Sequence, residues 1–433
     1  LTQTLIGTAL DISGDIDVDG TSNLDVVDID GAVDMASTLQ VDGVATFTGR
    51  DIHSGGITIA NAGQIGSVGD TDAIAIASDG VVTLTQKLVG TELDISGNVD
   101  VDGTTETDVL TINGSQFNYK AFGTSSIMIG DTTTGTIDAA DNNVGLGVDV
   151  FAALTTGDNN VAVGFSAGTA LTTGVDNILI GGLAGDALTD ADFNVAVGKI
   201  ALTSDTLGSR TTAIGYGALQ SQNFTSATAT YNTALGYNAG GSVTTGVSNT
   251  LIGSLAGDAL TVGSFNLALG YTALSADTAG KFSTALGYGA LNQQNFSSAT
   301  NAYNTAVGYV AGEVITTGIQ NTLIGALAGD ANTTGNFNTS LGYASLSANT
   351  TAEMNTAIGR TALQSNTTGA NNTAVGGQAL QTSTTAANNT AVGFGSLVQN
   401  TTGEANTAVG KGAAGNVTTG SDNTAIGYLA LGA

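Results

Sequence analysis

A short motif that repeats along the second half of the chain constrains its fold more than any other feature. The motif reads NNTAVG at residues 371 to 376, and successive copies of its glycine are 17 residues apart except for two steps of 21. This regularity predicts a solenoid, in which each turn is stable only when it stacks on its neighbours. The marker glycines are Gly130, Gly147, Gly164, Gly181, Gly198, Gly215, Gly236, Gly253, Gly270, Gly287, Gly308, Gly325, Gly342, Gly359, Gly376, Gly393, Gly410 and Gly427.

The residues around each marker glycine predict a turn of parallel β-structure. The position before the glycine holds Val, Ile or Leu in all 18 copies, and the third position after it holds Ala in 14. We expect both positions to point into a thin core. A 17-residue repeat does not fit the 3.6-residue period of a helix. The chain contains no proline, as expected where almost every backbone N–H donates to the next turn.

Asparagine occupies the fourth position before the marker glycine in 15 of the 18 copies. Stacked turns lie about 4.8 Å apart, so these side-chain amides are expected to form a hydrogen-bonded ladder. Ser126, Thr211 and Ser283 take the position in the other copies, and all three can form hydrogen bonds. The predicted structural ladder includes Asn160, Asn177, Asn232, Asn249, Asn304, Asn321, Asn355, Asn372, Asn389 and Asn406.

Aromatic residues recur with the same period. Seven of the ten tyrosines directly follow a marker glycine, and the two 21-residue steps insert four residues at one point, giving a 72-residue super-repeat. A stripe of rings fits a sugar-binding track, although packing against a neighbouring subunit is the favoured interpretation. The candidate ligand-binding residues are Tyr216, Tyr237, Tyr271, Tyr288, Tyr309 and Tyr343 in the stripe, with Phe224 and Phe296 in the insertions.

Residues 1 to 120 follow a different pattern. The segment 1–31 returns as 84–114 with 20 of 31 positions identical. Asp15, Asp17 and Asp19 alternate with apolar residues, as in a strand with one wet face. Strands this short hold no core on one chain, so we expect three chains around a common axis. The predicted domains are an acidic trimeric β shaft at 1–120 and a solenoid of 18 turns at 121–433.

The acidic motif DIDVDG, which starts at Asp15, resembles half of a calcium loop. An EF-hand also requires Glu at its twelfth position, where this chain has Val26. We therefore expect no metal site, and a weak cation site at Asp15, Asp17 and Asp19, shared between chains, is the alternative. Catalysis is not expected either, because His53 is the sole histidine, cysteine is absent and no nucleophile elbow occurs. No cofactor is expected.

The acidic composition limits the partners of the chain. A net charge of −28 argues against nucleic acid, whose phosphates would be repelled. The sequence contains no run of 18 apolar residues, so we expect no membrane insertion. The chain begins at Leu1 instead of Met and ends at Ala433, soon after the last marker glycine, so we expect a processed product.

These motifs resemble two families of fibrous proteins. The pattern NTAVG-xx-AL-xxx-TTG over residues 126–433 resembles the head repeats of YadA-like trimeric autotransporter adhesins, although a 17-residue turn is longer than the usual adhesin turn. It is more similar to the repeats of phage tail fibres, marine phages in particular, whose shafts resemble LDISGDIDVDG and GDTDAIAIASDG. The resemblance implies an all-β, elongated homotrimeric fibre, with an N-terminal triple-stranded β shaft followed by a parallel β-solenoid wound as a left-handed β-roll.

The resemblance also implies a function. It indicates a structural and adhesive virion fibre, a tail fibre that projects from the particle and attaches to the host surface by multivalent binding. The expected partners are two further copies of the chain, other virion tail or baseplate proteins, and a host surface glycan or protein. The alternative is a trimeric adhesin of the bacterial surface, or an extracellular filament subunit. Ice binding by threonine arrays and polysaccharide degradation are two further alternatives.

Overall fold

The computed structural model describes residues 140–432 without a gap and shorter segments before them. The chain divides into two compact units, Leu1–Thr104 and Thr105–Ala433. Asp15, Asp17, Asp19 and His53 lie outside the described residues, as does most of the duplicated module. The shorter described segments are 32–33, 40–46, 48, 59, 64–67, 70–77, 81–84, 110–112, 115–117, 119–122 and 126–129.

The described part of the first unit contains a small antiparallel sheet. Its strands follow the order β1-β2-β3, with Ile74 of the central strand opposite both Ile65 and Leu84. Ile65, Val82 and Leu84, three of the apolar side chains described in this sheet, are exposed. The bounds are β1 (Gln64–Ser67), β2 (Asp70–Ile76) and β3 (Val82–Leu84).

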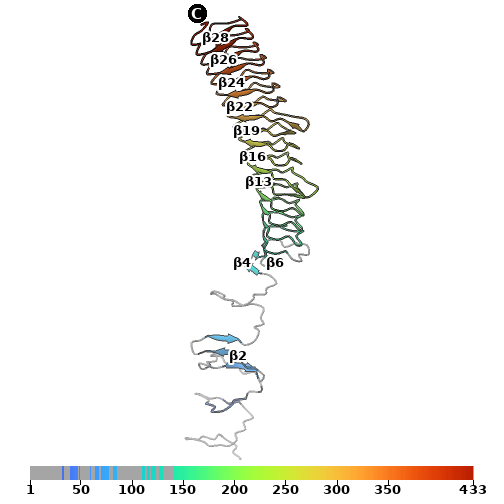
Figure 1. Cartoon of the computed structure of the whole chain (residues 1–433). Helices are drawn as coiled ribbons and strands as arrows, with labels where there is room; N and C mark the ends of the chain where they lie inside the picture. Colours follow the sequence, from blue (N-terminus) through green and yellow to red (C-terminus); the bar gives the residue numbers. More distant parts are fainter. Residues whose placement is uncertain are drawn as a thin grey trace, which may run out of the picture. The chain divides into compact units, whose positions relative to one another are not determined.

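The second unit is an all-β parallel solenoid, as predicted, and the structure has no helix among its described residues. It opens with two antiparallel pairs, and the last of these strands then pairs in parallel with the first turn of the solenoid. Figure 1 shows the strands of the later turns above one another on one side of this unit. The opening strands are β4 (Leu110–Ile112), β5 (Ser115–Phe117), β6 (Tyr119–Phe122) and β7 (Ser126–Ile129).

Each turn of the solenoid contributes one three-residue strand to a single parallel ladder. The strands are β8 (Val144–Leu146), β9 (Val161–Val163), β10 (Ile178–Ile180), β11 (Val195–Val197), β13 (Thr212–Ile214), β15 (Thr233–Leu235), β16 (Thr250–Ile252), β17 (Leu267–Leu269), β19 (Thr284–Leu286), β21 (Thr305–Val307), β22 (Thr322–Ile324), β23 (Thr339–Leu341), β24 (Thr356–Ile358), β25 (Thr373–Val375), β26 (Thr390–Val392), β27 (Thr407–Val409) and β28 (Thr424–Ile426).

The register places identical positions over one another. In β25 and β26, for example, Thr373 pairs with Thr390, Ala374 with Ala391 and Val375 with Val392. A turn of 17 residues is therefore confirmed. The 17 steps from β7 to β28, at about 4.8 Å each, give a ladder about 80 Å long.

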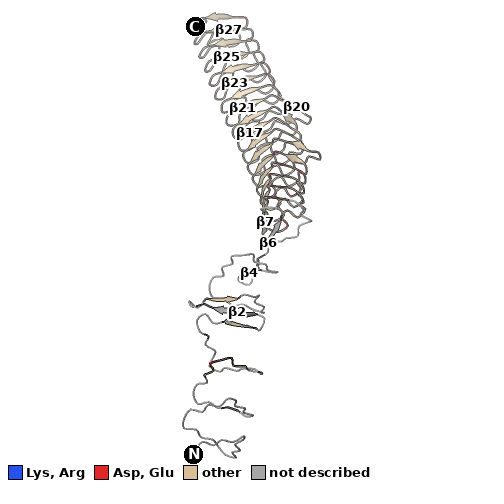
Figure 2. Ribbon diagram, turned by 60° about the horizontal axis from the view of Figure 1, so that its bottom comes forward, with Lys and Arg blue, Asp and Glu red and all other residues tan. Residues whose placement is uncertain are grey.

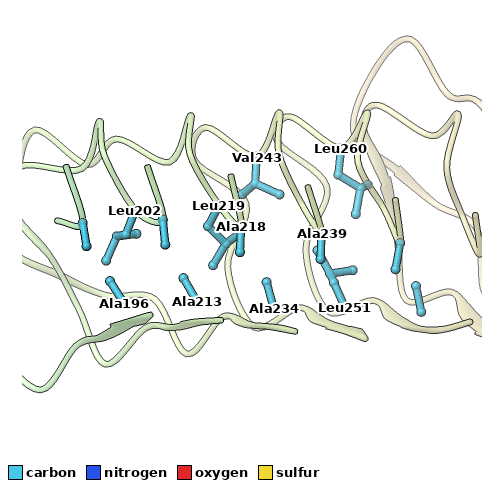
Figure 3. Close-up of a cluster of buried hydrophobic side chains, with 14 of the residues drawn as sticks. Ala196, Leu202, Ala213, Ala218, Leu219, Ala234, Ala239, Val243, Leu251 and Leu260 are labelled. Atoms are coloured by element: carbon cyan, nitrogen blue, oxygen red, sulfur yellow. The ribbon is translucent and has the colours of Figure 1, made fainter. Parts of the chain in front are cut away.

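The core lies between the middle residues of the strands and the opposite wall of each turn. Figure 3 shows Ala213, Ala234 and Leu251 pointing inward from the sheet, towards Leu219 and Val243. The sequence analysis placed the Val, Ile or Leu before the marker glycine in the core, and this was wrong. Those residues point outward, because side chains alternate along a strand and the middle residue, usually alanine, takes the inner place. The core is too thin for larger side chains at every turn.

Three turns contain a larger residue at the inner strand position and a compensating glycine. Leu179, Leu251 and Leu323 replace the usual alanine and are fully buried. In the same turns Gly257 and its equivalents stand where nine of the 18 turns have leucine, and Gly240 takes that position in the turn before Gly257. A Cβ would lie 2.8 Å from Leu251 Cδ2 at Gly257 and 2.7 Å from Leu251 Cδ1 at Gly240. Glycines of two adjacent turns therefore make room for each of these leucines, as close packing requires.

The marker glycines are required for two independent reasons. From Gly147 to Gly427 their φ angles lie between 122° and 145°, a region that only glycine adopts readily. A Cβ at Gly270 would in addition collide with the carbonyl oxygen of Gly287 in the next turn. A Cβ at Gly427, whose φ is 122°, would meet nothing within 4 Å.

This difference predicts unequal costs for the same substitution. Gly427→Ala should lower the free energy of unfolding by about 1–3 kcal/mol, the cost of the backbone strain alone. Gly270→Ala should lower it further, because the Gly287 carbonyl is held in the ladder and cannot move aside. Thermal unfolding followed by circular dichroism would measure both variants, and equal losses would contradict the close approach of adjacent marker glycines.

Candidate interaction face

The outward side of the parallel sheet forms one continuous surface, called here the outer face. Four positions of every turn build it: the first and third strand residues, the residue after the marker glycine, and the residue two places before the strand. In the turn of β17 these are Phe265, Leu267, Leu269 and Tyr271. Phe265, Leu269 and Tyr271 expose 44–49 % of their surface. In this turn the face is apolar and uncovered in the single chain, whereas in the other turns from β13 to β28 the first strand residue is threonine.

The residues after the marker glycines form the post-glycine column of the outer face. The predicted ligand-binding tyrosines Tyr216, Tyr237, Tyr271, Tyr288, Tyr309 and Tyr343 all lie in it and are about half exposed. Neighbouring rings stack on one another: the ring centroids of Tyr271 and Tyr288 lie 5.5 Å apart, and those of Tyr288 and Tyr309 lie 5.4 Å apart. Stacked rings expose their edges. A sugar packs against the face of a ring, so the column offers sugars little surface.

A second aromatic column, which the sequence analysis missed, borders the other edge of the outer face. This pre-strand column consists of the residues two places before each strand. The rings of Phe265 and Phe282 stack at 5.0 Å, those of Phe282 and Tyr303 at 5.2 Å, and Arg210 lies 5.2 Å from the centre of the Phe193 ring. The column is visible in the sequence only by counting five residues back from each marker glycine. Its aromatic members are Phe193, Tyr231, Phe265, Phe282, Tyr303 and Phe337.

The charges on the outer face differ from those of the chain as a whole. Between residues 193 and 411 its four positions include no acidic residue. They do include Lys199, Arg210, Arg360 and Lys411, although residues 140–432 contain just five Lys and Arg in all. Over this range the surface therefore carries a few positive charges and no negative ones, in a chain whose net charge is −28.

The asparagines named in the sequence analysis are buried at the start of each strand. Asn232 Oδ1 accepts the backbone N–H of Asn249 at 2.9 Å, and Asn249 Nδ2 donates to the carbonyl of Gly263 at 2.9 Å. In some turns the amides also bond directly, as in Asn338 Nδ2 to Asn321 Oδ1 at 3.2 Å. Each side chain therefore joins two turns and closes a corner of its own turn.

The two 21-residue turns, called long turns here, carry loops that leave the solenoid. Figure 2 shows the loop at β20 protruding away from the side that carries the strands of the ladder. Residues 225–227 and 297–299 are exposed at the loop tips, whereas Phe224 and Phe296 are buried beneath them, with 8 % and 6 % exposed. A two-stranded parallel sheet joins each loop to the turn before it. The pairs are β12 (Gly208–Ser209) with β14 (Thr228–Ala229), and β18 (Gly280–Lys281) with β20 (Thr300–Asn301).

A buried polar network holds each long turn. Asp277 Oδ1 accepts the backbone N–H groups of Gly280 at 3.0 Å and Phe296 at 3.2 Å, and Asp277 Oδ2 accepts Gln294 Nε2 at 2.6 Å. Gln294 also donates to Ser283 Oγ at 2.8 Å. Ser283 stands at a position of the asparagine ladder, so the amide of Gln294 replaces the one that is missing there. Asp205, Gln222, Phe224 and Thr211 repeat the arrangement one super-repeat earlier.

Burial raises the pKa of the Asp277 carboxyl, because desolvation of its charge outweighs the hydrogen bonds from Gln294 and the backbone. Burial also raises the pKa of Asp330, assisted by the nearby Glu313 carboxylate. The equivalent Asp258 accepts a hydrogen bond from Ser275 at 2.6 Å. The carboxylates of Asp277 and Asp258 join adjacent turns, whereas Asp330 Oδ1 has no hydrogen-bond partner among the described residues.

The described residues contain no group of three or more His, Asp or Glu side chains that could hold a metal ion. Among the same residues, no helix is long and apolar enough to cross a membrane. Comparisons with protein-family models, with curated proteins and with solved structures give no match. The outer face and the long turns are therefore the features of this chain that point to a function.

The buried carboxylate predicts a pH dependence of stability. Because the pKa of Asp277 is raised above its ordinary value of 3.8, the folded state retains a proton that the unfolded state has lost. The free energy of unfolding should therefore fall as pH rises from 3.8 to the folded pKa, by at most about 1.4 kcal/mol per pH unit. Denaturant titrations across this range would measure the slope.

Asp277→Asn should reduce this slope and leave the part that the raised pKa of Asp330 contributes. The asparagine should also cost about 1–3 kcal/mol, since its amide cannot accept hydrogen bonds at both positions. Identical slopes in the unsubstituted chain and in Asp277→Asn would contradict the assignment.

Proposed function

We propose that this chain is the structural and adhesive fibre of a virion, a tail fibre that attaches to the host surface as a homotrimer. The observation that supports the proposal best is the long parallel ladder, in which near-identical turns repeat one exposed surface over about 80 Å. A rigid rod that repeats its surface suits reach and multivalent contact, where many weak sites together bind firmly.

The outer face supports the trimeric part of the proposal. Contiguous exposed apolar surfaces of this extent mark contacts with other molecules. Its rings are stacked edge-outward along both columns, which suits packing against another protein surface better than stacking on sugars. Around a three-fold axis parallel to the solenoid, three outer faces would cover one another. The left-handed winding and the N-terminal shaft belong to the same proposal.

The long turns support the adhesive part. Their exposed tips, residues 225–227 and 297–299, lie 72 residues apart, or four turns at about 4.8 Å each. Insertions at one point of a repeat often form the binding side of a solenoid. The tips consist of Thr225, Ser226 and Ala227, and of Ser297, Ser298 and Ala299. Hydroxyl-rich tips of this kind suit hydrogen bonding to a surface glycan.

Assembly through the outer face can be tested with a matched pair of variants. Leu269 on the outer face and Val262 at a corner of the same solenoid are exposed to similar extents, 44 % and 41 %. Leu269→Glu should convert the trimer to monomer, because three carboxylates would be buried around the axis. Val262→Glu should leave the trimer intact. Sedimentation equilibrium would measure the mass, and two trimeric variants would contradict this use of the face.

The location of the protein tests the function itself. Antibody raised against the chain, used with immunogold electron microscopy on material from its source, should label the tail fibres of virus particles. Label on bacterial envelopes alone would favour the surface-adhesin alternative. The fluorescent chain should also adsorb to host cells, and Ser226→Arg with Ser298→Arg should reduce adsorption without changing the trimer mass.

A further inference from the structure

The two edges of the outer face match each other in size, turn by turn. In the turn of β16, Ser248 stands in the pre-strand column and Ser254 in the post-glycine column, so both edges are small. The turn of β22 again combines two non-aromatic residues, Gln320 and Ala326. Turns with rings at both edges are Tyr231 with Tyr237, Phe265 with Tyr271, Phe282 with Tyr288, Tyr303 with Tyr309, and Phe337 with Tyr343.

This match has no cause within one chain. The two edge residues of a turn are six positions apart across the strand, up to about 20 Å at the rise of extended backbone. The ring contacts in both columns join neighbouring turns along the solenoid, and none joins the two edges. A match between residues that do not touch points to a contact between copies.

Charges at the two edges match in the same way. Each of the three cationic residues of the post-glycine column has an acidic residue seven positions before it, at the opposite edge of the same turn. The pairs are Asp192 with Lys199, Glu353 with Arg360, and Glu404 with Lys411. No ion pair joins them within the chain among the residues that the structure describes, and the three cationic side chains are exposed.

We propose that copies of this chain assemble without axial stagger, so that the post-glycine edge of each turn meets the pre-strand edge of the same turn in the next copy. The inference rests on the proposed trimer and specifies its interface. Rotation about an axis parallel to the solenoid keeps every turn at its own height, and a closed ring uses both edges of every copy. Lys411 of one copy then pairs with Glu404 of the next, and rings meet rings.

Other registers do not preserve the match. A shift by one turn places Ser248 opposite Tyr271, and Tyr231 opposite Ser254, so a small residue faces a ring at both contacts. The same shift separates Lys199, Arg360 and Lys411 from their acidic partners. Towards both ends of the solenoid the match is looser, as in Asn159 with Phe165 and Asn388 with Phe394. The central turns from β11 to β24 therefore determine the register.

Because the chain contains no cysteine, a disulfide can report the register without interference. Ser248→Cys combined with Ser254→Cys in the full chain should give, after mild oxidation, a covalent trimer on a non-reducing denaturing gel. Ser248→Cys combined with Ala326→Cys is the matched control, since its cysteines are four turns apart in height and should remain unlinked. A link in the control, or links in both proteins, would overturn the register.

Charge reversal provides a second measurement that needs no disulfide geometry. Lys411→Glu and Glu404→Lys should each lower the dissociation temperature of the trimer, and the double variant should restore it. A trimer that shows neither the 248–254 link nor this restoration would refute the register and leave the proposed function standing. A monomeric chain would refute the interface altogether. If the disulfide-linked trimer forms but antibody against the chain labels no virus particle, only the proposed function is refuted.

Discussion

Every turn of this solenoid satisfies its backbone by hydrogen bonds to the turns on either side, and the rest of the structure depends on that constraint. Within the sheet, Thr250 N–H donates to the carbonyl of Asn266 at 2.8 Å, and at a corner Thr244 N–H donates to Thr261 at 2.9 Å. The same bonds recur at every turn, so turns must be alike in length and path. This explains the absence of proline and the glycine wherever one turn approaches the next too closely for a Cβ.

Vertical repetition also determines what the side chains can do. Inside the solenoid it permits small residues at most strand positions, with leucine in the strand only where a neighbouring glycine makes room, as at Leu251 and Gly257. On the outside, stacking places the same repeat position of successive turns one above another, so one tyrosine in each turn forms a column. The apolar outer face is thus a direct result of stacking, and a partner surface with the same 4.8 Å repeat is the natural complement.

Much of this fold could be predicted from the sequence, because a fixed period determines turn length and the conserved spacing of Asn and Gly determines the corners. The sequence does not tell which strand side chain points into the core, because adjacent residues such as Ala374 and Val375 are both apolar. The larger residue was assigned to the core, but the core accepts the smaller one. The pre-strand column is hidden when each residue is counted forward from the preceding marker glycine. The four extra residues of the long turns then give Tyr231 and Tyr303 different numbers from the other members of the column. The burial of Phe224 and Phe296 was also beyond sequence reasoning, since an insertion reveals nothing of the small core that supports it.

The 72-residue super-repeat connects these features. Long turns begin at Gly215 and Gly287, and Ser248 and Gln320 each lie 33 residues beyond one of these glycines. Each super-repeat therefore carries one protruding loop and one turn without rings at its edges. Because both matched edges belong to the same turn, duplicating a 72-residue block lengthens the fibre and carries complete contacts with it. In a staggered assembly each duplication would separate partners that lie in different blocks. An unstaggered interface therefore lets such a fibre grow by duplication without redesign of its contacts.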